Sequence, residues 1–430
     1  MIVAAAVGVF LVTYAFIATE KVHRVTAALG GVAAMTLLGL VDADTAFFDQ
    51  QTGIDWNVIF LLFGMMVIVG ILKHTGLFEF LALWAARRSH GRPGRLLALL
   101  MVITACVSPV LDNVTTVLLV APVTLSVCDR LGVTPAPYLI GLVFASNVGG
   151  TGTLIGDPPN IIIASRGGLS FKDFLVHALP IAAVLVVVLV VMCQWLFRRE
   201  LHTPDVHPAS LMALEPRTAI TDAGRLARCL VVLVVTMVFF GLHHLQHVDP
   251  SVVAMVGAGA MVVVARATPE EFLAEIEWNT LAFFMALFVL VGCLVQIGVI
   301  GDVGRAAADA LGDQELLAAT VLLFGSAVVG AFVDNIPYTA ATVPIVDELV
   351  AASATPGAES PLWWAFVLGA DLGGNTTAVA AGANVVVLGI AAKAGHPISF
   401  WQFTRYGIVV TLATLCVSWL YVWLRYFVLM

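Results

Sequence analysis

The sequence predicts an all-α polytopic membrane protein that is built from two inverted repeats. Hydrophobic residues make up 60% of the 430 residues and charged residues only 11%, with a mean hydropathy of +1.02. A soluble domain carries about twice that share of charged residues. The tetrad Leu111–Val114 returns as Val333–Ile336, 222 residues later (111 to 333), and each copy places an Asp-Asn pair inside an apolar stretch.

The same displacement holds well beyond the tetrad, so the two halves share one register. It pairs Trp56 with Trp278, Asn57 with Asn279, Gly70 with Gly292, Gly76 with Gly298 and Pro122 with Pro344. A duplicated half with repeated buried polar sites is typical of secondary transporters, which bind their substrate at the interface between the repeats.

The apolar stretches predict five crossings and one re-entrant hairpin in each half, since a helix needs roughly 20 apolar residues to cross the bilayer. In the first half, crossings are expected near 2–19, 24–41, 55–73 and 177–197, with a hairpin at about 95–128 that folds at Asp112-Asn113 and a broken helix at about 135–165. In the second half, they are expected near 226–245, 251–265, 279–298 and 406–428, with a hairpin at about 315–350 that folds at Asp334-Asn335 and a broken helix at about 362–392. Residues 79–95 combine Phe80 and Trp84 with arginines and predict an interfacial amphipathic arm.

These elements divide the chain into a first repeat at 1–198, a cytoplasmic linker at 199–225 with Pro204, Pro208 and Pro216, and a second repeat at 226–430. An odd number of crossings in each half inverts the second repeat relative to the first. Most Lys and Arg residues fall in one set of loops, and only Arg166, Lys172, Arg305 and Arg425 fall in the other. The positive-inside rule therefore predicts a multi-pass protein of the inner or plasma membrane with both termini extracytoplasmic. Six tryptophans are predicted to anchor helix ends at the interface: Trp56, Trp195, Trp278, Trp363, Trp364 and Trp401.

Several classes of function are disfavoured by what the sequence lacks. The net charge of −8 comes with no basic block, so nucleic acid is not an expected partner. The six cysteines fall singly without metal-ligand spacing and predict reduced packing residues, and the histidine cluster at 243–247 predicts a solvated loop, so no metal and no organic cofactor is expected. No HExxH or GxSxG motif indicates an enzyme, and without a Walker A motif any coupling to ATP would need a separate ATPase subunit.

The breaks in the two broken helices are the predicted site. Gly-rich backbone at membrane depth persists only where it lines a cavity or binds something, because lipid cannot satisfy its carbonyls and amides. Small residues can also simply pack helices closely, but the duplication of Gly-Gly with Asn, Thr and Asp favours a substrate or ion site. The candidates in the first half are Asp112, Asn113, Thr115, Thr116, Asn147, Gly149, Gly150, Thr151, Thr153, Asp157 and Asn160. Those in the second half are Asp334, Asn335, Thr339, Asp371, Gly373, Gly374, Asn375, Thr376, Thr377 and Asn384.

Four of these candidates are carboxylates, namely Asp112, Asp157, Asp334 and Asp371. An unpaired carboxylate is costly in the bilayer and tends to hold a proton. Since no basic residue lies in either polar run, the pattern predicts coupling to H⁺ or Na⁺ and disfavours a multiply charged anion. Asp112 and Asp334 have a plainer alternative role as N-caps of the inner hairpin arms.

At these residues the chain resembles the ion transporter superfamily, in the branch of the arsenical pump membrane protein (ArsB), the P-protein and NhaD-type permeases, which share a CitMHS-like domain. The resemblance rests on LDNVTTVLLVAPV at 111–123, FASNVGGTGTLIGDPPNIIIAS at 144–165 and GIDWNVIFLLFGMM at 53–66. It implies a homodimer in which a fixed scaffold holds a mobile, elevator-type transport domain. Relatives that carry dicarboxylates have Ser-Asn-Thr at the hairpin tips, whereas this chain has Asp-Asn-Val and Asp-Asn-Ile, which favours the arsenite or sodium/proton branches.

The function expected from the sequence is therefore proton-coupled efflux of arsenite or antimonite. Arsenite near neutral pH is an uncharged trihydroxy solute that suits Asn, Thr and backbone donors beside protonatable Asp. A sodium/proton antiporter and an anion or dicarboxylate permease are the alternatives, and a non-transporting membrane scaffold is a distant one.

Overall fold

The structure, a computed structural model, describes residues 2–19, 21–49, 52–201, 215–246, 248–311 and 314–429. All regular secondary structure in these ranges is helical. Eight of the helices are long and apolar enough to span a membrane, and five shorter helices are also apolar. The predicted all-α polytopic class is confirmed. Residues 202–214 of the predicted linker and the side chains of the histidine cluster at 243–247 lie outside the described part.

The helices of the first half follow the predicted order, with additional short elements. They are α1 (Ile2–Thr19), α2 (Arg24–Leu37), α3 (Ala43–Phe47), α4 (Trp56–Lys73), α5 (Leu77–Ser89), α6 (Pro93–Leu111), α7 (Asn113–Leu131), α8 (Ala136–Gly150), α9 (Pro158–Gly167), α10 (Phe171–His177) and α11 (Leu179–Leu196). The predicted amphipathic arm at 79–95 is α5 together with the start of α6. The second predicted crossing ends at Leu37 rather than at residue 41, and Gly39 follows it in a left-handed conformation with a φ of +67°.

The second half repeats this order of elements. After the short helix η1 (Pro216–Ala219) come α13 (Ala223–Gln246), α14 (Pro250–Ala265), α15 (Pro269–Leu273), α16 (Trp278–Gln296), α17 (Val299–Leu311), α18 (Glu315–Gly330), α19 (Asn335–Ala351), η2 (Gly357–Glu359), α20 (Pro361–Gly373), α21 (Gly382–Lys393), α22 (Phe400–Trp423) and η3 (Leu424–Val428). Helix α22 begins six residues earlier than the predicted residue 406, because the Ser399 hydroxyl accepts a hydrogen bond from the Gln402 amide (3.1 Å) and caps the helix.

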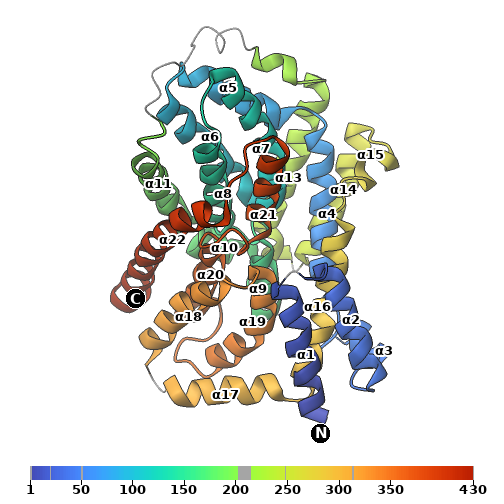
Figure 1. The fold of residues 1–430 in the computed structure, drawn as a ribbon. Coiled ribbons are helices and arrows are strands. Elements are labelled where there is room, and N and C mark those ends of the chain that lie inside the picture. Colours follow the sequence, from blue (N-terminus) through green and yellow to red (C-terminus); the bar gives the residue numbers. More distant parts are fainter. Residues whose placement is uncertain are drawn as a thin grey trace.

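The two hairpins enter the molecule from opposite ends. Helices α6 and α7 meet at Asp112, which caps both, and α18 and α19 meet at the turn before Asn335. Figure 1 shows α5 to α7 at one end of the molecule and α17 to α19 at the other. This arrangement is what an inverted duplication produces.

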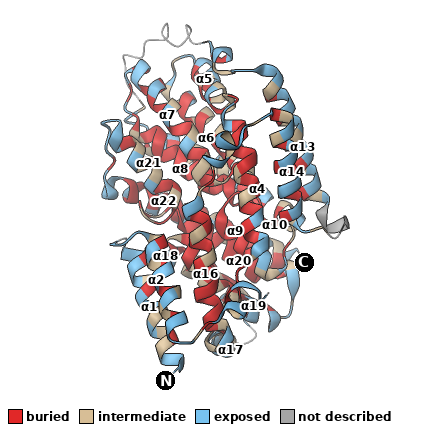
Figure 2. Cartoon of the chain, turned by 90° about the vertical axis from the view of Figure 1, so that its right-hand side faces the viewer, coloured by how far each residue is buried: buried red, intermediate tan, exposed pale blue. Residues whose placement is uncertain are grey.

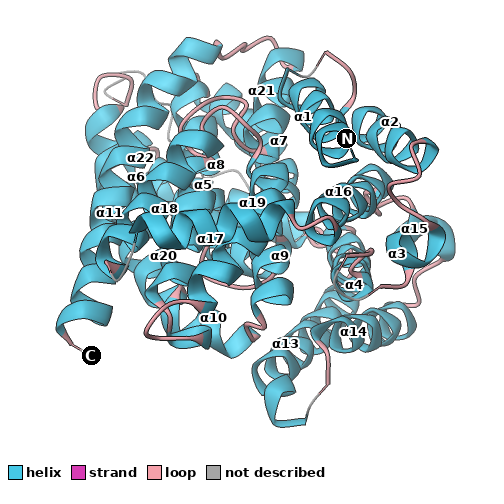
Figure 3. Ribbon diagram, turned by 90° about the horizontal axis from the view of Figure 1, so that it is seen from below, coloured by secondary structure: helices cyan, strands magenta, loops and turns pink. Residues whose placement is uncertain are grey.

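The helices form two packed groups, which Figure 3 shows side by side. In one group, which we call the hairpin body, α6 and α7 pack on α8, α18 packs on α20, α19 packs on α9, and α11 and α22 flank them. In the other, which we call the frame, α4 and α13 pack on α14, and α1 and α16 pack on α2. Helices α4 and α16 of the frame contact α9 and α19 of the hairpin body.

Burial is concentrated where these groups meet. Figure 2 shows the buried residues running through the centre of the molecule, while the outer helices are largely exposed. The exposed residues on those outer helices are apolar, as at Val187 on α11 (64% exposed) and Val256 on α14 (67%). An apolar surface of this kind is suited to contact with lipid.

The tryptophan prediction is only partly right. Trp56, Trp195, Trp278 and Trp401 are exposed, as interfacial anchors are, but Trp363 and Trp364 are 1% and 0% exposed. Those two begin α20, which is buried along its whole length, so they pack in the core instead. The described cysteines are all free, as predicted, although Cys106 and Cys416 are exposed rather than packed.

Two glycines set how closely the broken helices approach the hairpins. A Cβ on Gly149 would lie 2.5 Å from the carbonyl oxygen of Ala105 on α6, and a Cβ on Gly373 would lie 2.7 Å from the Cα of Ala327 on α18. The two contacts are equivalent in the two halves (105 + 222 = 327). Both glycines therefore serve helix packing, which was the plainer of the two readings of the Gly-Gly pairs.

Substituting Gly149 by Ala is expected to destabilise the protein by about 1–3 kcal/mol, because the backbone of α6 must move to admit the methyl group. Gly389→Ala on α21 is the matched control, since nothing lies within 4 Å of its added Cβ. The thermal midpoint of the detergent-purified protein checks this expectation. An equal midpoint in both variants would show that the α6–α8 contact is not tight.

Candidate transport site

The two breaks lie in the buried centre of the molecule. Helix α8 ends at Gly150 and α9 begins at Pro158, while α20 ends at Gly373 and α21 begins at Gly382. The polar side chains of both breaks are inaccessible to solvent, with 0% exposure at Asn147, Thr151, Asp157, Asn160, Asp371, Asn375 and Asn384. Polar groups at this depth need partners, and their partners define the site.

A chain of amides joins the two halves at this point. The Asn147 amide nitrogen donates to the side-chain oxygens of Asn375 (3.0 Å) and Asn384 (3.3 Å), which belong to the second half. The Asn113 amide nitrogen, at the tip of the first hairpin, donates to Asn147 Oδ1 (3.1 Å) and Asp157 Oδ2 (2.9 Å). The breaks therefore form one site rather than two.

One asparagine in each half, Asn160 and Asn384, donates hydrogen bonds to backbone carbonyls of its own break. The Asn160 amide nitrogen donates to the carbonyl oxygens of Gly150 (3.4 Å) and Thr153 (3.0 Å). The Asn384 amide nitrogen donates to the carbonyl oxygens of Gly374 (2.7 Å) and Thr377 (2.7 Å). These bonds satisfy carbonyls that the interrupted helices leave without intrahelical partners.

Several predicted threonines support the site without facing it. Thr153 and Thr377 donate to the carbonyl oxygens of Pro109 (2.5 Å) and Ala331 (2.7 Å), and so tie each break to the hairpin of its own half. Thr376 bonds to Thr411 on α22 (3.2 Å). Three others bond locally, Thr115 and Thr116 to Asp112 and Thr151 to the Asn147 carbonyl oxygen.

Buried polar atoms without partners surround the amide chain. Among the described residues, the acceptors without a hydrogen bond include Asn113 Oδ1, Asp157 Oδ1, Asn160 Oδ1 and both Asp371 oxygens, and the donors include Asn335 Nδ2, Thr339 Oγ1 and Asn375 Nδ2. Native proteins leave few such groups unsatisfied, so a concentration at one place indicates a ligand site. The acceptors named come from both halves, and the donors named all come from the second half.

The two fully buried carboxylates come from non-equivalent positions of the two repeats. Asn147 corresponds to Asp371 and Asp157 to Ala381, at a displacement of 224 residues (147 to 371 and 157 to 381). Each half thus contributes one fully buried carboxylate. In the described part of the chain, neither makes an ion pair with a basic residue.

The hairpin tips differ from one another. Asp112 accepts a hydrogen bond from the Thr115 amide (2.8 Å) and Asp334 from the Ile336 amide (3.0 Å), so both aspartates cap the inner arms, as the plainer reading predicted. Asp334 also forms an ion pair with Arg24 Nη1 (3.2 Å), at the start of α2 in the frame. No such cation pairs with Asp112 among the described residues.

Arg24 is the functional candidate that sequence reasoning missed. The polar runs themselves contain no basic residue, and Arg24 reaches the second tip from 310 positions away in the chain. Its guanidinium also lies over the Phe283 ring, 5.3 Å from the ring centre. Tyr14 on α1 adds a bond to the Pro337 carbonyl oxygen (2.9 Å), so the frame holds the second hairpin at two points.

A cavity of about 900 Å³ lies between the frame and the hairpin body. Asp55, Trp56 and Asn57 of α4 and its cap line one side, and Ser165 and Arg166 at the end of α9 line the other. The Arg166 guanidinium lies over the ring of Phe288 on α16, 5.8 Å from its centre. Arg166 and Arg305, which both line the cavity, belong to the loops that the charge pattern predicts to be extracytoplasmic.

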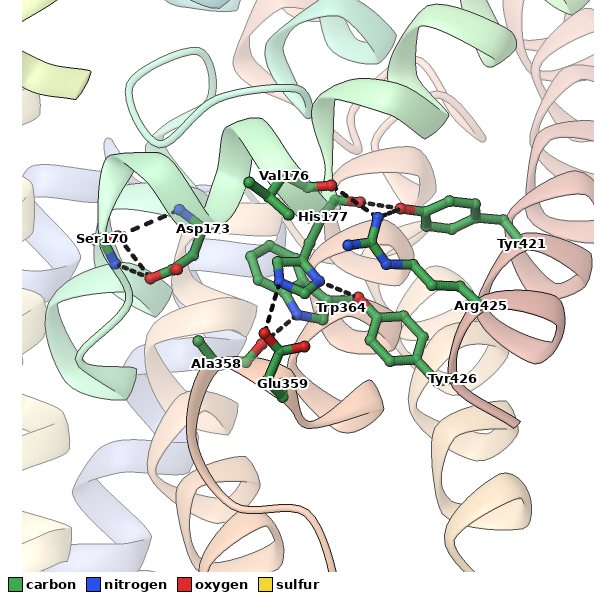
Figure 4. Close-up of polar contacts among 10 residues, drawn as sticks. All are labelled: Ser170, Asp173, Val176, His177, Ala358, Glu359, Trp364, Tyr421, Arg425 and Tyr426. Atoms are coloured by element: carbon green, nitrogen blue, oxygen red, sulfur yellow. Dashed lines mark hydrogen bonds and ion pairs between the residues drawn. The ribbon is translucent and has the colours of Figure 1, made fainter. Parts of the chain in front are cut away.

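A second buried cluster surrounds His177, at the end of α10 (Figure 4). The imidazole stacks on the Trp364 indole, with ring centres 4.6 Å apart, and its Nδ1 shares a 2.5 Å hydrogen bond with the Tyr426 hydroxyl. Its Nε2 lies 3.7 Å from Glu359. Because Arg425 also donates to the Val176 carbonyl oxygen (2.8 Å), the cluster joins α10, α20 and η3.

The His177 cluster is expected to loosen at acidic pH. Burial, together with the nearby Arg425, lowers the pKa of His177 below its ordinary 6.5. The unfolded chain then binds the proton more readily than the folded one, so the stability present above pH 6.5 is lost as the pH falls. Thermal midpoints between pH 7.5 and about 5 should fall less in His177→Gln than in the parent chain. Parallel pH profiles for the two proteins would contradict this.

Comparison with known proteins gives consistent matches. Residues 14–369 match the family model CitMHS, described as citrate transporter. An uncharacterized transporter of Mycobacterium tuberculosis is 51% identical over 425 residues, which cover 98% of this chain and 99% of the relative. The P protein of Homo sapiens is 32% identical over 486 residues, which cover 95% of this chain and 58% of that protein. The crystal structure of the Alcanivorax borkumensis YdaH transporter, described as having an unusual topology, superposes with a TM-score of 0.62 at 13% identity and covers 99% of this chain and 98% of its own.

Proposed function

We propose that this chain, which belongs to the citrate transporter (CitMHS) family and is a membrane transporter, performs proton-coupled efflux of arsenite or antimonite. The observation that carries the proposal is the set of partnerless buried atoms around Asp157 and Asp371. Both carboxylates lack a basic partner among the described residues, so they suit a proton and a neutral solute better than an anion such as citrate.

A trihydroxy solute fits the donor and acceptor set of the site. Its hydroxyl groups can donate to the free oxygens of Asp371 and Asn160, and its oxygens can accept from the amide of Asn375. A buried carboxylate without a basic partner tends to hold a proton, so Asp157 and Asp371 are the expected proton carriers. Solute and proton then compete for the same oxygens, and that competition is the coupling an exchanger needs.

Alternating access would follow an elevator-type shift of the hairpin body against the frame, within a homodimer. The proposal is supported by the two groups of packed helices and by the cavity between them at one face. The Arg24–Asp334 ion pair and the Tyr14–Pro337 hydrogen bond bridge the groups, so both would break during the shift. The proposed cycle is driven by the proton gradient, and coupling to ATP would need a separate ATPase subunit.

Sodium/proton antiport is the second candidate, and the same oxygens favour it. Asp157, Asp371 and Asn160 offer several free oxygen ligands, which hard cations prefer. An anion or dicarboxylate permease is less well supported, because among the described residues the basic side chain that reaches a hairpin tip is Arg24, and Asp334 already pairs with it.

A proteoliposome flux screen tests the proposal. Arsenite, sodium, chloride and citrate are presented in turn, with and without an imposed pH gradient. Arsenite flux that depends on the pH gradient is the expected result. Sodium-dependent proton flux with no arsenite movement would replace the proposal with the antiporter, and citrate flux would contradict both.

A further inference from the structure

We propose that the groove between α5 and η1 binds the phosphate headgroup of an anionic membrane lipid. The groove has a volume of about 680 Å³. Its lining includes the aromatic residues Phe80 and Trp84 and the arginines Arg87, Arg88 and Arg217, with Glu215 as the acidic member. It lies at the end of the molecule that carries α5, opposite the end that carries α17 (Figure 1).

The three arginines are available for a ligand. None of them forms an ion pair or a side-chain hydrogen bond with any residue in the described part of the chain. Guanidinium groups bind phosphate oxygens in pairs of parallel hydrogen bonds, which makes Arg the preferred residue for this group. Three unpaired guanidinium groups against one glutamate leave the groove with a positive charge to neutralise.

The aromatic residues indicate a lipid rather than a free phosphate. Phe80, Trp84 and Arg88 succeed one another at intervals of four residues and so share one face of α5. Trp84 is 42% exposed, and Arg88 is exposed as well. Trp at the level of the headgroups with Arg beside it is the pattern of an interfacial helix, and basic pockets next to membrane helices bind anionic headgroups.

The equivalent positions of α17, at the opposite end of the molecule, do not carry these side chains. The repeat places Asp302, Ala306 and Asp309 of α17 at the positions of Phe80, Trp84 and Arg87, each 222 residues later (80 to 302, 84 to 306 and 87 to 309). Of the two equivalent positions, only the one at α5 carries the aromatic and basic side chains. The positive-inside rule predicts that this face meets the anionic cytoplasmic leaflet.

A lipid in this groove would act on the hairpin body. Helix α5 packs on both α6 and α7, the two arms of the first hairpin, and η1 packs on α5. The bound lipid would therefore travel with the first hairpin or restrain it, according to whether the headgroup stays in its leaflet.

Native mass spectrometry of the full-length protein with added phosphatidylglycerol, phosphatidylcholine or inorganic phosphate tests the proposal. Phosphatidylglycerol should remain bound to the parent chain, and its affinity should fall roughly tenfold or more in Arg87→Gln/Arg88→Gln. The matched control Arg92→Gln/Arg95→Gln removes the same amount of charge from a neighbouring stretch of the sequence that does not line the groove. It should bind phosphatidylglycerol as the parent chain does.

Three results would overturn the proposal. They are equal loss of phosphatidylglycerol from both double variants, equal retention of phosphatidylcholine by the parent chain, and displacement of the lipid by an equal concentration of inorganic phosphate. The last would identify a free-phosphate site instead. Trp84→Ala supplies an independent check, because it keeps every charge and should still weaken binding of the lipid.

Discussion

Replacing Asp157 with Asn is expected to abolish proton-coupled flux while leaving the protein folded. Asn is nearly isosteric with Asp, and its oxygen can still accept the hydrogen bond from Asn113, which is 2.9 Å long in the parent chain. The variant cannot exchange a proton, however, and an ionisable group at membrane depth is the expected carrier of coupling. Flux driven by an imposed pH gradient should fall by about two orders of magnitude or more.

Asp371→Asn should have the same effect, because each half contributes one carboxylate to the shared site. Asp42→Asn is the control, since Asp42 caps α3 at an exposed position and Asn caps equally well. Wild-type coupling in either buried variant, with arsenite and sodium both tested, would exclude that carboxylate from the coupling site.

Reversing the charge of Arg24 is expected to give the second large effect. Arg24→Asp places a carboxylate beside Asp334, where the parent chain has a 3.2 Å ion pair between the frame and the second hairpin. Removing one partner of a partly buried pair leaves the other charge uncompensated. We expect roughly tenfold slower flux, because the second tip loses its position against the frame.

The charge swap Arg24→Asp/Asp334→Arg should recover part of this flux, although Arg at position 334 cannot cap the Ile336 amide as Asp does. Arg24→Lys keeps the charge and should remain close to the parent chain. A double variant that is no better than Arg24→Asp alone would indicate that Arg24 acts through its contact with the Phe283 ring rather than through Asp334.

The repeat explains why most of the fold could be predicted from the sequence. Buried polar residues in apolar stretches are conspicuous in the sequence. The displacement between the two repeats is enough to locate both hairpin tips and both helix breaks. Hydropathy also located each long helix to within six residues at either end. The short helices α3, α10 and α15 were missed because they are too brief to produce a periodic apolar pattern.

Contacts across the halves could not be predicted in the same way. The displacement aligns Asn147 with Asp371, but in space Asn147 bonds to Asn375 and Asn384, which no alignment of the repeats indicates. In the sequence, Arg24 stands at the start of an apolar helix, which is typical of a cation in a loop. Its ion pair with Asp334 depends on how α2 packs beside the second hairpin. Trp364 at a helix start looked like an interfacial anchor, whereas it is buried under His177.

The asymmetry between the repeats is the feature that most shapes the proposed chemistry. A strict duplication would have placed two equivalent carboxylates at the site, but Asp157 faces Ala381 in the register and Asp371 faces Asn147. The two carboxylates therefore belong to different parts of their breaks, with Asp157 before α9 and Asp371 near the end of α20. Such a pair can hold one proton in two different surroundings, which a coupled exchanger requires.

The most direct test of the shared site is the release of protons when solute binds to the purified protein. Arsenite, and separately sodium, is added in weakly buffered detergent solution that contains a pH-sensitive dye, with binding followed by calorimetry. The account predicts that binding to the parent chain releases protons and that Asp157→Asn/Asp371→Asn releases none. Binding without proton release, or equal release from the double variant, would contradict it.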